Sequence, residues 1–76
     1  MEEFLRFVLS ELVEFPDEVV ITRADSGNKT VFHVAARKSD IPKIIGKGGH
    51  TVQAIRSLLA ASAAKHGARA ELEIVE

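Results

Sequence analysis

The sequence predicts an α+β fold in which a helix and a β-hairpin precede two further helices and a last strand. Three observations predict this order. Residues 1–15 have the apolar spacing of an amphipathic helix, and residues 19–36 hold two β-rich segments around a turn cluster. Residues 41–76 then contain two helical segments joined by a glycine-rich loop and followed by an alternating segment. With 76 residues, 46% of them hydrophobic, we expect a single domain over residues 1–76 with one small core.

The first helix is predicted from an apolar stripe that recurs every three or four residues. The stripe consists of Met1, Phe4, Leu5, Val8, Leu12 and Phe15. Leu9 and Val13 widen it on one flank. Phe7 falls near the polar side, where either a binding partner or another element of the chain would cover it. Pro16 ends the helix, because a residue that precedes proline disfavours the α conformation.

Two strands are predicted, at residues 19–24 and 30–36, because both segments are rich in β-branched residues. Residues 25–29 lie between them and have the composition and length of a hairpin loop. The second strand alternates in character, and we expect Phe32 and Val34 to face the core.

The second half of the chain begins with a short helix over residues 41–45. Ser39 and Asp40 offer an N-cap, Pro42 suits the first turn, and Gly46 stops the helix. A longer helix is expected from about His50 to His66. Apolar and polar residues alternate over residues 69–76, which predicts a strand with one solvent-exposed face. Ala70, Leu72 and Ile74 are expected to point inward, and Glu71, Glu73 and Glu76 mostly outward.

Composition excludes several classes of function. The chain has no cysteine, so neither a disulfide nor a thiolate metal site is expected. His33 is expected to be a solvated strand residue, and the other histidines are isolated, so no metal or cofactor is expected. No apolar run approaches the ~20 residues of a membrane span, and the acidic start lacks the features of a signal peptide. We therefore expect a cytoplasmic protein without a membrane partner.

The segment Gly46-Lys47-Gly48-Gly49 is the clearest candidate for a ligand-binding site in the sequence. Its glycines allow the backbone to approach a ligand closely. The next helix opens with unpaired N–H groups and a positive dipole end, so a phosphate there would also meet the ammonium of Lys47. The whole chain has a net charge of −1, yet the cations concentrate around this loop, as Arg37, Lys38, Lys43, Lys47 and Arg56 against one anion, Asp40.

With Ile44 and Ile45 before it and Val52 after it, this loop resembles the helix–GxxG–helix unit of KH-domain RNA-binding proteins. The short length and the order of elements resemble the bacterial KhpA family of type II KH domains. The resemblance implies an αββααβ fold. It implies a three-stranded mixed sheet, packed on one face by three helices, with the strand at residues 30–36 in the centre.

The resemblance also implies the residues that bind single-stranded RNA. They are Gly46, Lys47, Gly48 and Gly49 as the backbone clamp; Ile44, Ile45, Val52 and Ile55 as the apolar frame; and Lys43, His50 and Arg56 as flanking phosphate contacts. Arg37 and Lys38, at a strand end, are less well placed. The sequence does not divide the apolar frame between an RNA groove and the core.

Departures from the family pattern bear on affinity. There is no Tyr or Trp, and all four Phe lie outside the loop segment, so stacking of bases on aromatic rings is not expected. We therefore expect weak binding with loose sequence preference, raised by avidity when two domains act together. The resemblance implies such pairing, as a homodimer or with a larger KH protein of the Jag (KhpB) type. It also implies work as an RNA chaperone linked to cell shape and cell wall biogenesis.

The predicted helix at residues 50–66 has a face of small residues, namely Ala54, Ser57, Ala60, Ala61 and Ala64. Such a face admits a second helix, but alanine is also the best helix former on an exposed surface. The leading hypothesis is an RNA-binding module. The alternative is a protein-interaction module with the same fold and little RNA affinity. An enzyme is disfavoured, because the P-loop spacing is absent and no catalytic set converges on the loop.

Overall fold

The computed structural model describes residues 1–75, so Glu76, expected in the last strand, lies outside the described residues. The elements are α1 (Glu2–Leu12), β1 (Val20–Ser26), β2 (Lys29–Ala35), α2 (Ile41–Ile45), α3 (His50–Ala64) and β3 (Arg69–Ile74). Single turns of 3₁₀ helix occur at Pro16–Glu18, Lys38–Asp40 and Lys47–Gly49. The predicted αββααβ order is confirmed.

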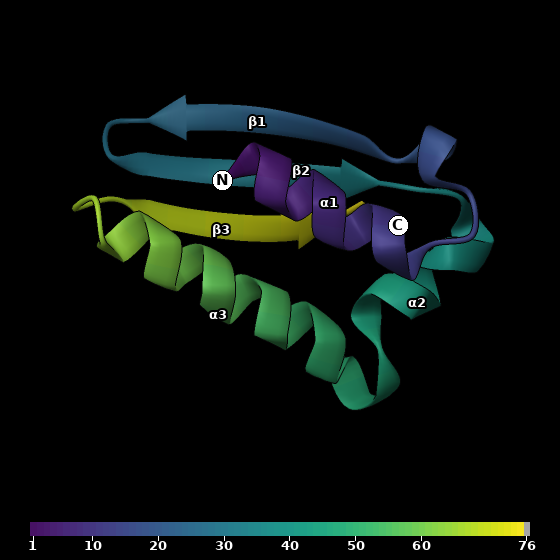
Figure 1. The fold of residues 1–76 in the computed structure, drawn as a ribbon. Helices are drawn as coiled ribbons and strands as arrows, with labels where there is room; N and C mark the ends of the chain where they lie inside the picture. Colours follow the sequence, from purple (N-terminus) through teal and green to yellow (C-terminus); the bar gives the residue numbers. More distant parts are fainter. Residues whose placement is uncertain (76) are drawn as a thin grey trace.

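The sheet has the order β1-β2-β3. β1 runs antiparallel to β2, with pairs from Val20–Ala35 to Ser26–Lys29, and β3 runs parallel to β2, from Lys29–Arg69 to Val34–Ile74. A parallel neighbour requires a long crossover, and α2 and α3 supply it. Figure 1 shows the three helices on one side of this sheet. The predicted mixed sheet with β2 in the centre is therefore confirmed.

The core lies between the sheet and the helices. Phe32 and Val34 of β2 are fully buried, as predicted from the alternation. They form one cluster with Leu5 and Leu9 from α1, Ile44 from α2, Val52, Ile55 and Leu59 from α3, Val19, and Leu72 from β3. The opposite face of the sheet carries ion pairs between β2 and β3, and His33 there contacts Glu73 at 3.2 Å.

Helix α1 differs from the prediction in its end and in its buried face. The helix was expected to reach Phe15, but it ends at Leu12, and Val13 is extended. The reason is Asp40, whose carboxylate accepts hydrogen bonds from the backbone N–H groups of Glu14 (3.1 Å) and Phe15 (3.0 Å). These bonds hold the segment before Pro16 out of the helical path.

The buried face of α1 is centred on Leu5 and Leu9, whereas Phe4 is 42% exposed. The prediction placed Leu9 on a flank of the apolar stripe and not at its centre. The apolar residues of this helix cover a wide arc, and the sequence alone does not mark the middle of that arc. Phe7 is 65% exposed, so no other element within residues 1–75 covers it.

Asp40 joins the end of α1 to the start of α2. Asp40 occupies the predicted N-cap position of α2, but its side chain is fully buried and makes no N-cap hydrogen bond to that helix. Burial alone would raise the pKa of this carboxyl, but the N–H groups of Glu14 and Phe15 and the nearby Lys43 ammonium outweigh it and lower the pKa. The ionised carboxylate therefore braces two elements that are distant in sequence.

Both strands of the hairpin continue further into the turn than predicted, whereas at the open end β1 begins one residue later and β2 ends one residue earlier than predicted. Residues 25–29 were expected as a loop, yet Ser26 pairs with Lys29 and leaves a two-residue turn. Asp25 stays within β1 because its carboxylate accepts hydrogen bonds from the Thr30 hydroxyl (2.6 Å) and from Arg23 (3.0 Å). The same contacts, with the Thr30 bond the largest, lower the pKa of Asp25. α3, in turn, ends at Ala64, two residues before the predicted His66.

Candidate nucleic-acid interface

The glycine loop connects α2 to α3 at one end of the molecule (Figure 1). Gly46 ends α2, its N–H donating to the Pro42 carbonyl at 2.9 Å, and Gly49 donates to the Gly46 carbonyl at 3.1 Å. The chain thus turns within four residues, and α3 begins at His50. Lys47 and Gly48 are exposed at the tip, whereas Gly46 and Gly49 are half-buried. The loop therefore offers its tip to a ligand and keeps its ends fixed.

Gly46 is the position at which only glycine fits. Its φ is +77° and its ψ is 171°, a combination that is essentially confined to glycine. A Cβ atom there would lie 2.1 Å from Thr51 Oγ1 and 2.9 Å from the Thr51 backbone nitrogen. Gly49 has φ +77° and ψ 10°, but a Cβ at that position would meet nothing within 4 Å. The two ends of the loop are thus constrained to different degrees.

The predicted cations divide into free and paired groups. Lys47 is exposed at the loop tip, and Lys38 is exposed before α2; neither forms an ion pair within residues 1–75. Lys43 lies 3.4 Å from the Asp40 carboxylate and 3.5 Å from that of Glu14. The free positive charge at the loop is therefore smaller than the sequence count of cations.

Arg37 is held away from the loop. Its Nε donates to the Glu18 carboxylate at 2.8 Å, and its guanidinium lies 3.7 Å from the centre of the Phe15 ring. The hydrogen bond to Glu18 raises the pKa of the Arg37 guanidinium. Stacking and pairing together fix Arg37 against the segment that follows α1.

The apolar frame divides into core and partly exposed residues. Ile44, Val52 and Ile55 belong to the buried core, and Ile45 is half-buried beside the loop. His50 is exposed at the start of α3, with its imidazole next to Gly48. The structure thus brings Ile45, Lys47 and His50 to the accessible surface around the loop and uses the other three apolar residues to hold α2 and α3 against the sheet.

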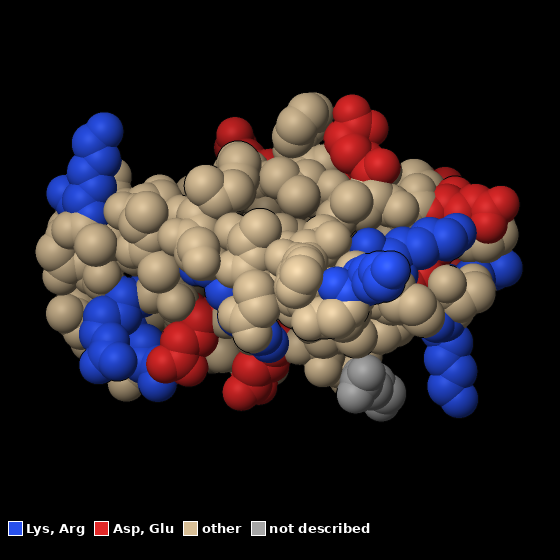
Figure 2. Space-filling view, turned by 90° about the horizontal axis from the view of Figure 1, so that it is seen from below, with Lys and Arg blue, Asp and Glu red and all other residues tan. Residues whose placement is uncertain are grey.

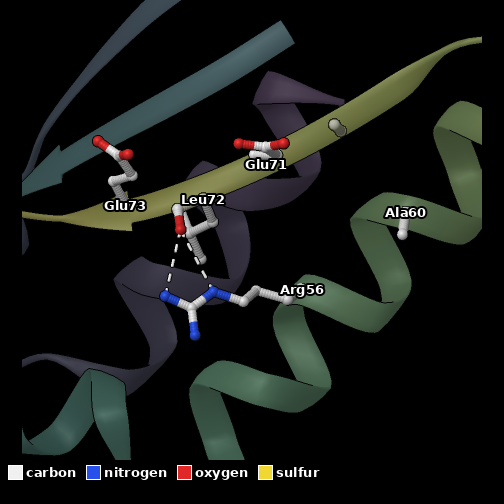
Figure 3. Close-up of a pocket in the computed structure, with 6 residues that line it drawn as sticks. Arg56, Ala60, Glu71, Leu72 and Glu73 are labelled. Atoms are coloured by element: carbon white, nitrogen blue, oxygen red, sulfur yellow. Dashed lines mark hydrogen bonds between the residues drawn. The ribbon is translucent and has the colours of Figure 1, made fainter. Parts of the chain in front are cut away.

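Arg56 does not point to the loop. It lies about 9 Å further along α3 than His50, given a rise of 1.5 Å per residue. Its Nε and Nη2 both donate to the Leu72 carbonyl oxygen, each at 3.2 Å. Figure 3 shows the guanidinium reaching from α3 to β3 across a pocket. The pocket has a volume of about 390 Å³ and is lined by Arg56, Ala60, Ala70, Glu71, Leu72 and Glu73.

This pocket lies at the outer edge of the sheet, because β3 pairs only with β2 in the described chain. The Arg69 N–H donates to the carbonyl of Asn28, just before β2, and the Val75 N–H donates to that of Val34 in β2. The N–H and C=O groups of the alternate residues Ala70, Leu72 and Ile74 therefore face the free edge. Figure 2, seen from below, shows a largely uncharged surface between groups of cations at the two ends. A polar backbone edge thus borders the pocket beside α3, whose lining includes both apolar and charged residues.

The sequence did not identify the β3 wall of the pocket. Ala60, Ala70 and Leu72 carry no chemical signal of their own, and their meeting depends on how α3 crosses the sheet. Arg56 was singled out for its charge, and its position six residues beyond His50 was the signal that it lies past the loop.

Neither a candidate metal site nor a helix that could span a membrane occurs within residues 1–75. No group of three or more His, Cys, Asp or Glu side chains is placed to hold a metal ion there. In the same part of the chain, no helix has the length and apolar character needed to cross a bilayer.

Comparison with known proteins identifies a family. A family model described as "KhpA/KhpB, KH domain" matches residues 2–74. The chain is similar to the RNA-binding protein KhpA of Chlamydia pneumoniae, with 41% identity over the whole of this chain and 97% of that protein. It is 34% identical to RNA-binding protein KhpA of Listeria monocytogenes over the full length of both, and 32% identical to that of Oceanobacillus iheyensis over 99% and 100%. No solved structure matches the chain significantly.

Proposed function

The chain belongs to the KhpA/KhpB family of KH domains, and from that membership we propose that it is an RNA-binding module that holds short single-stranded RNA. The loop Gly46–Gly49 would clamp the sugar-phosphate backbone, and the bases would lie along α3 toward β3. The role proposed is binding rather than catalysis, with RNA as the ligand and no cofactor.

The observation that carries the proposal is the state of the loop tip. Lys47 is exposed, has no carboxylate partner within residues 1–75, and precedes the first turn of the 15-residue helix α3. The unpaired N–H groups and the positive dipole end of a helix attract a phosphate oxygen. The open space at Gly49 and the absence of a side chain at the exposed Gly48 let a nucleotide backbone approach.

The pocket beside β3 supports a place for bases. Its volume of about 390 Å³ lies within the range of small-molecule sites, and its lining combines Ala60, Ala70 and Leu72 with the charged residues Arg56, Glu71 and Glu73. Unstacked bases of single-stranded RNA expose their edges to such groups. A duplex buries the same edges, so the proposal is specific for single strands.

A charge reversal in the loop tests the proposal. Lys47→Asp combined with Gly48→Asp should abolish binding of a fluorescent single-stranded RNA, measured by anisotropy, because two carboxylates repel the phosphates. The fold should survive, because Lys47 is exposed and a Cβ at Gly48 would come no nearer than 3.6 Å to His50. Aspartate also tolerates the left-handed conformation of Gly48, whose φ is +64°.

Lys65→Asp is the matched control, because Lys65 is exposed at the far end of α3. It should leave RNA affinity within about twofold of the wild type, since it lies roughly 22 Å from the loop. Wild-type affinity in the double variant, with native circular dichroism, would contradict the clamp. An unmodified protein that binds no RNA would favour the protein-interaction alternative.

We also propose that α3 mediates pairing, as a homodimer or with a larger KH protein of the Jag (KhpB) type. Leu58 is 55% exposed on α3, and Ala54 and Ala61 lie beside it on the same face. Small residues around an exposed leucine allow a second helix to approach closely. Sedimentation equilibrium should show a mass above the monomer that Leu58→Glu removes and that Phe7→Glu, on the outer face of α1, does not. Loss of association in both variants, or in neither, would contradict this surface.

A further inference from the structure

Arg56 is a half-buried cation that forms no ion pair with a carboxylate within residues 1–75. Nε and Nη2 are both engaged by one oxygen, the Leu72 carbonyl, at 3.2 Å. Two carboxylates line the same pocket, but each contacts a side chain on β2: Glu71 lies 3.1 Å from Lys29 Nζ, and Glu73 lies 3.2 Å from His33 Nδ1. Figure 3 shows both of them on the other side of the β3 ribbon from Arg56.

The contact with Leu72 fixes the orientation of the guanidinium. A planar group held by two of its nitrogens on one oxygen has a defined plane, and the remaining donors then point in known directions. Nη1 makes no hydrogen bond within residues 1–75, and Figure 3 shows it directed away from β3. Nη1 and the second N–H of Nη2 therefore form a free pair of parallel donors on the side of the guanidinium away from the Leu72 carbonyl.

We infer that Arg56 determines base preference, by reading a base edge that carries two adjacent hydrogen-bond acceptors. Guanine presents O6 and N7 in this way, and cytosine presents O2 and N3 on its pairing edge. Adenine and uracil place a donor beside each acceptor on the corresponding edges, so they satisfy one donor of the fork and leave the other without a partner. This inference rests on the proposed RNA binding.

The geometry separates this role from a phosphate contact. Arg56 lies about 9 Å along α3 from the loop that would hold the backbone, and it faces the sheet edge. The free backbone groups of Ala70 and Ile74 flank it along β3. A base that approaches along α3 from a strand clamped at the loop would therefore meet the free edge of the guanidinium.

The test uses adenosine hexanucleotides that carry one guanosine, one cytidine or one uridine, with the all-adenosine hexamer as reference. Anisotropy should show that the wild type binds the guanosine hexamer or the cytidine hexamer about fivefold more tightly than it binds the uridine and all-adenosine hexamers. A fivefold difference is the lower end of what a bidentate contact supplies. The two hexamers distinguish guanine from cytosine. Arg56→Lys keeps the charge and removes the fork, so it should reduce this ratio to within twofold of unity.

Lys47→Gln provides the matched control, because it should weaken all four hexamers equally and preserve the ratio. An unchanged ratio in Arg56→Lys, or an equal loss for every hexamer, would overturn the inference while leaving RNA binding intact. No binding of any hexamer by the wild type would instead refute the proposed function and this inference with it.

A second measurement does not depend on how the variant folds. In the wild type, the Arg56 Nε–H resonance should shift on titration with the preferred hexamer and move at most slightly with the all-adenosine hexamer. Equal shifts with both hexamers would also overturn the inference.

Discussion

The different constraints on Gly46 and Gly49 predict that alanine substitutions three residues apart have unequal effects. At Gly49, alanine would meet no atom within 4 Å, so its cost is that of a left-handed L-residue, about 1–2 kcal/mol. At Gly46, the backbone conformation itself costs about 1–3 kcal/mol. The Cβ would also lie 2.1 Å from Thr51 Oγ1 and 2.9 Å from a backbone nitrogen that cannot move without displacing α3.

We therefore expect Gly46→Ala to lower the free energy of unfolding by at least about 3 kcal/mol, combining backbone strain with the displacement of α3. Gly49→Ala should lower it by about 1–2 kcal/mol. Urea denaturation followed by circular dichroism measures both. Gly27→Ala is the control for left-handed strain outside the loop, because Gly27 has φ +61° and open space around it. It should cost about as much as Gly49→Ala.

RNA binding distinguishes the loop from the control. Gly49→Ala should weaken binding of single-stranded RNA, because its methyl group stands where a nucleotide backbone would approach, whereas Gly27→Ala should leave binding unchanged. Equal losses of stability for Gly46→Ala and Gly49→Ala, within about 0.5 kcal/mol, would refute the assignment of a close contact between Gly46 and Thr51.

Three further outcomes are expected. Phe32→Ala should lower the free energy of unfolding by about 3–5 kcal/mol in denaturant melts, because Phe32 is fully buried in the core; a loss under about 1 kcal/mol would mean that this face of β2 is not packed. Because the folded-state pKa of Asp40 is lowered, its contribution is present above the unfolded pKa and lost as pH falls through the folded value, so the stability advantage of wild type over Asp40→Asn should shrink below about pH 4 in urea melts; an advantage independent of pH would contradict the brace. With two or three phosphate contacts, log affinity for single-stranded RNA should fall with log salt at a slope of about −1.4 to −2, and duplex RNA should bind more weakly; a slope near −6 or equal duplex affinity would indicate a diffuse basic surface.

The order of elements could be predicted because it depends on local periodicity. The alternation around Phe32 and Val34 and the glycine stop at Gly46 each act within a few residues, and the structure reproduces them. Asp40 shows the limit of such reasoning. Its carboxylate and its place before α2 predict an N-cap hydrogen bond. Its actual hydrogen-bond donors lie 25 and 26 residues earlier in the chain, and only the packed fold brings them together.

The candidate site divides in the same way. The loop residues were proposed from the resemblance of their GxxG pattern and apolar frame to KH domains, which is visible in the sequence because these residues are contiguous. The burial of Ile44, Val52 and Ile55 could not be predicted, because helix periodicity does not say whether an apolar face packs on a sheet or lines a ligand groove. The hydrogen-bond partner of Arg56 could not be predicted either, because it is the backbone carbonyl of Leu72 and every residue has such a group.

The parallel pairing of β2 with β3 has a consequence for how the chain acquires its structure. The central strand forms its first ladder with β1 through a two-residue turn, but its second ladder joins Lys29 to Arg69, across the whole helical crossover. Closing so long a segment costs chain entropy before any contact repays it, and such non-local pairing slows folding. During synthesis, Phe32 and the open edge of β2 therefore stay uncovered until residues 69–74 have left the ribosome. That interval is when aggregation or capture by a chaperone competes with completion of the sheet.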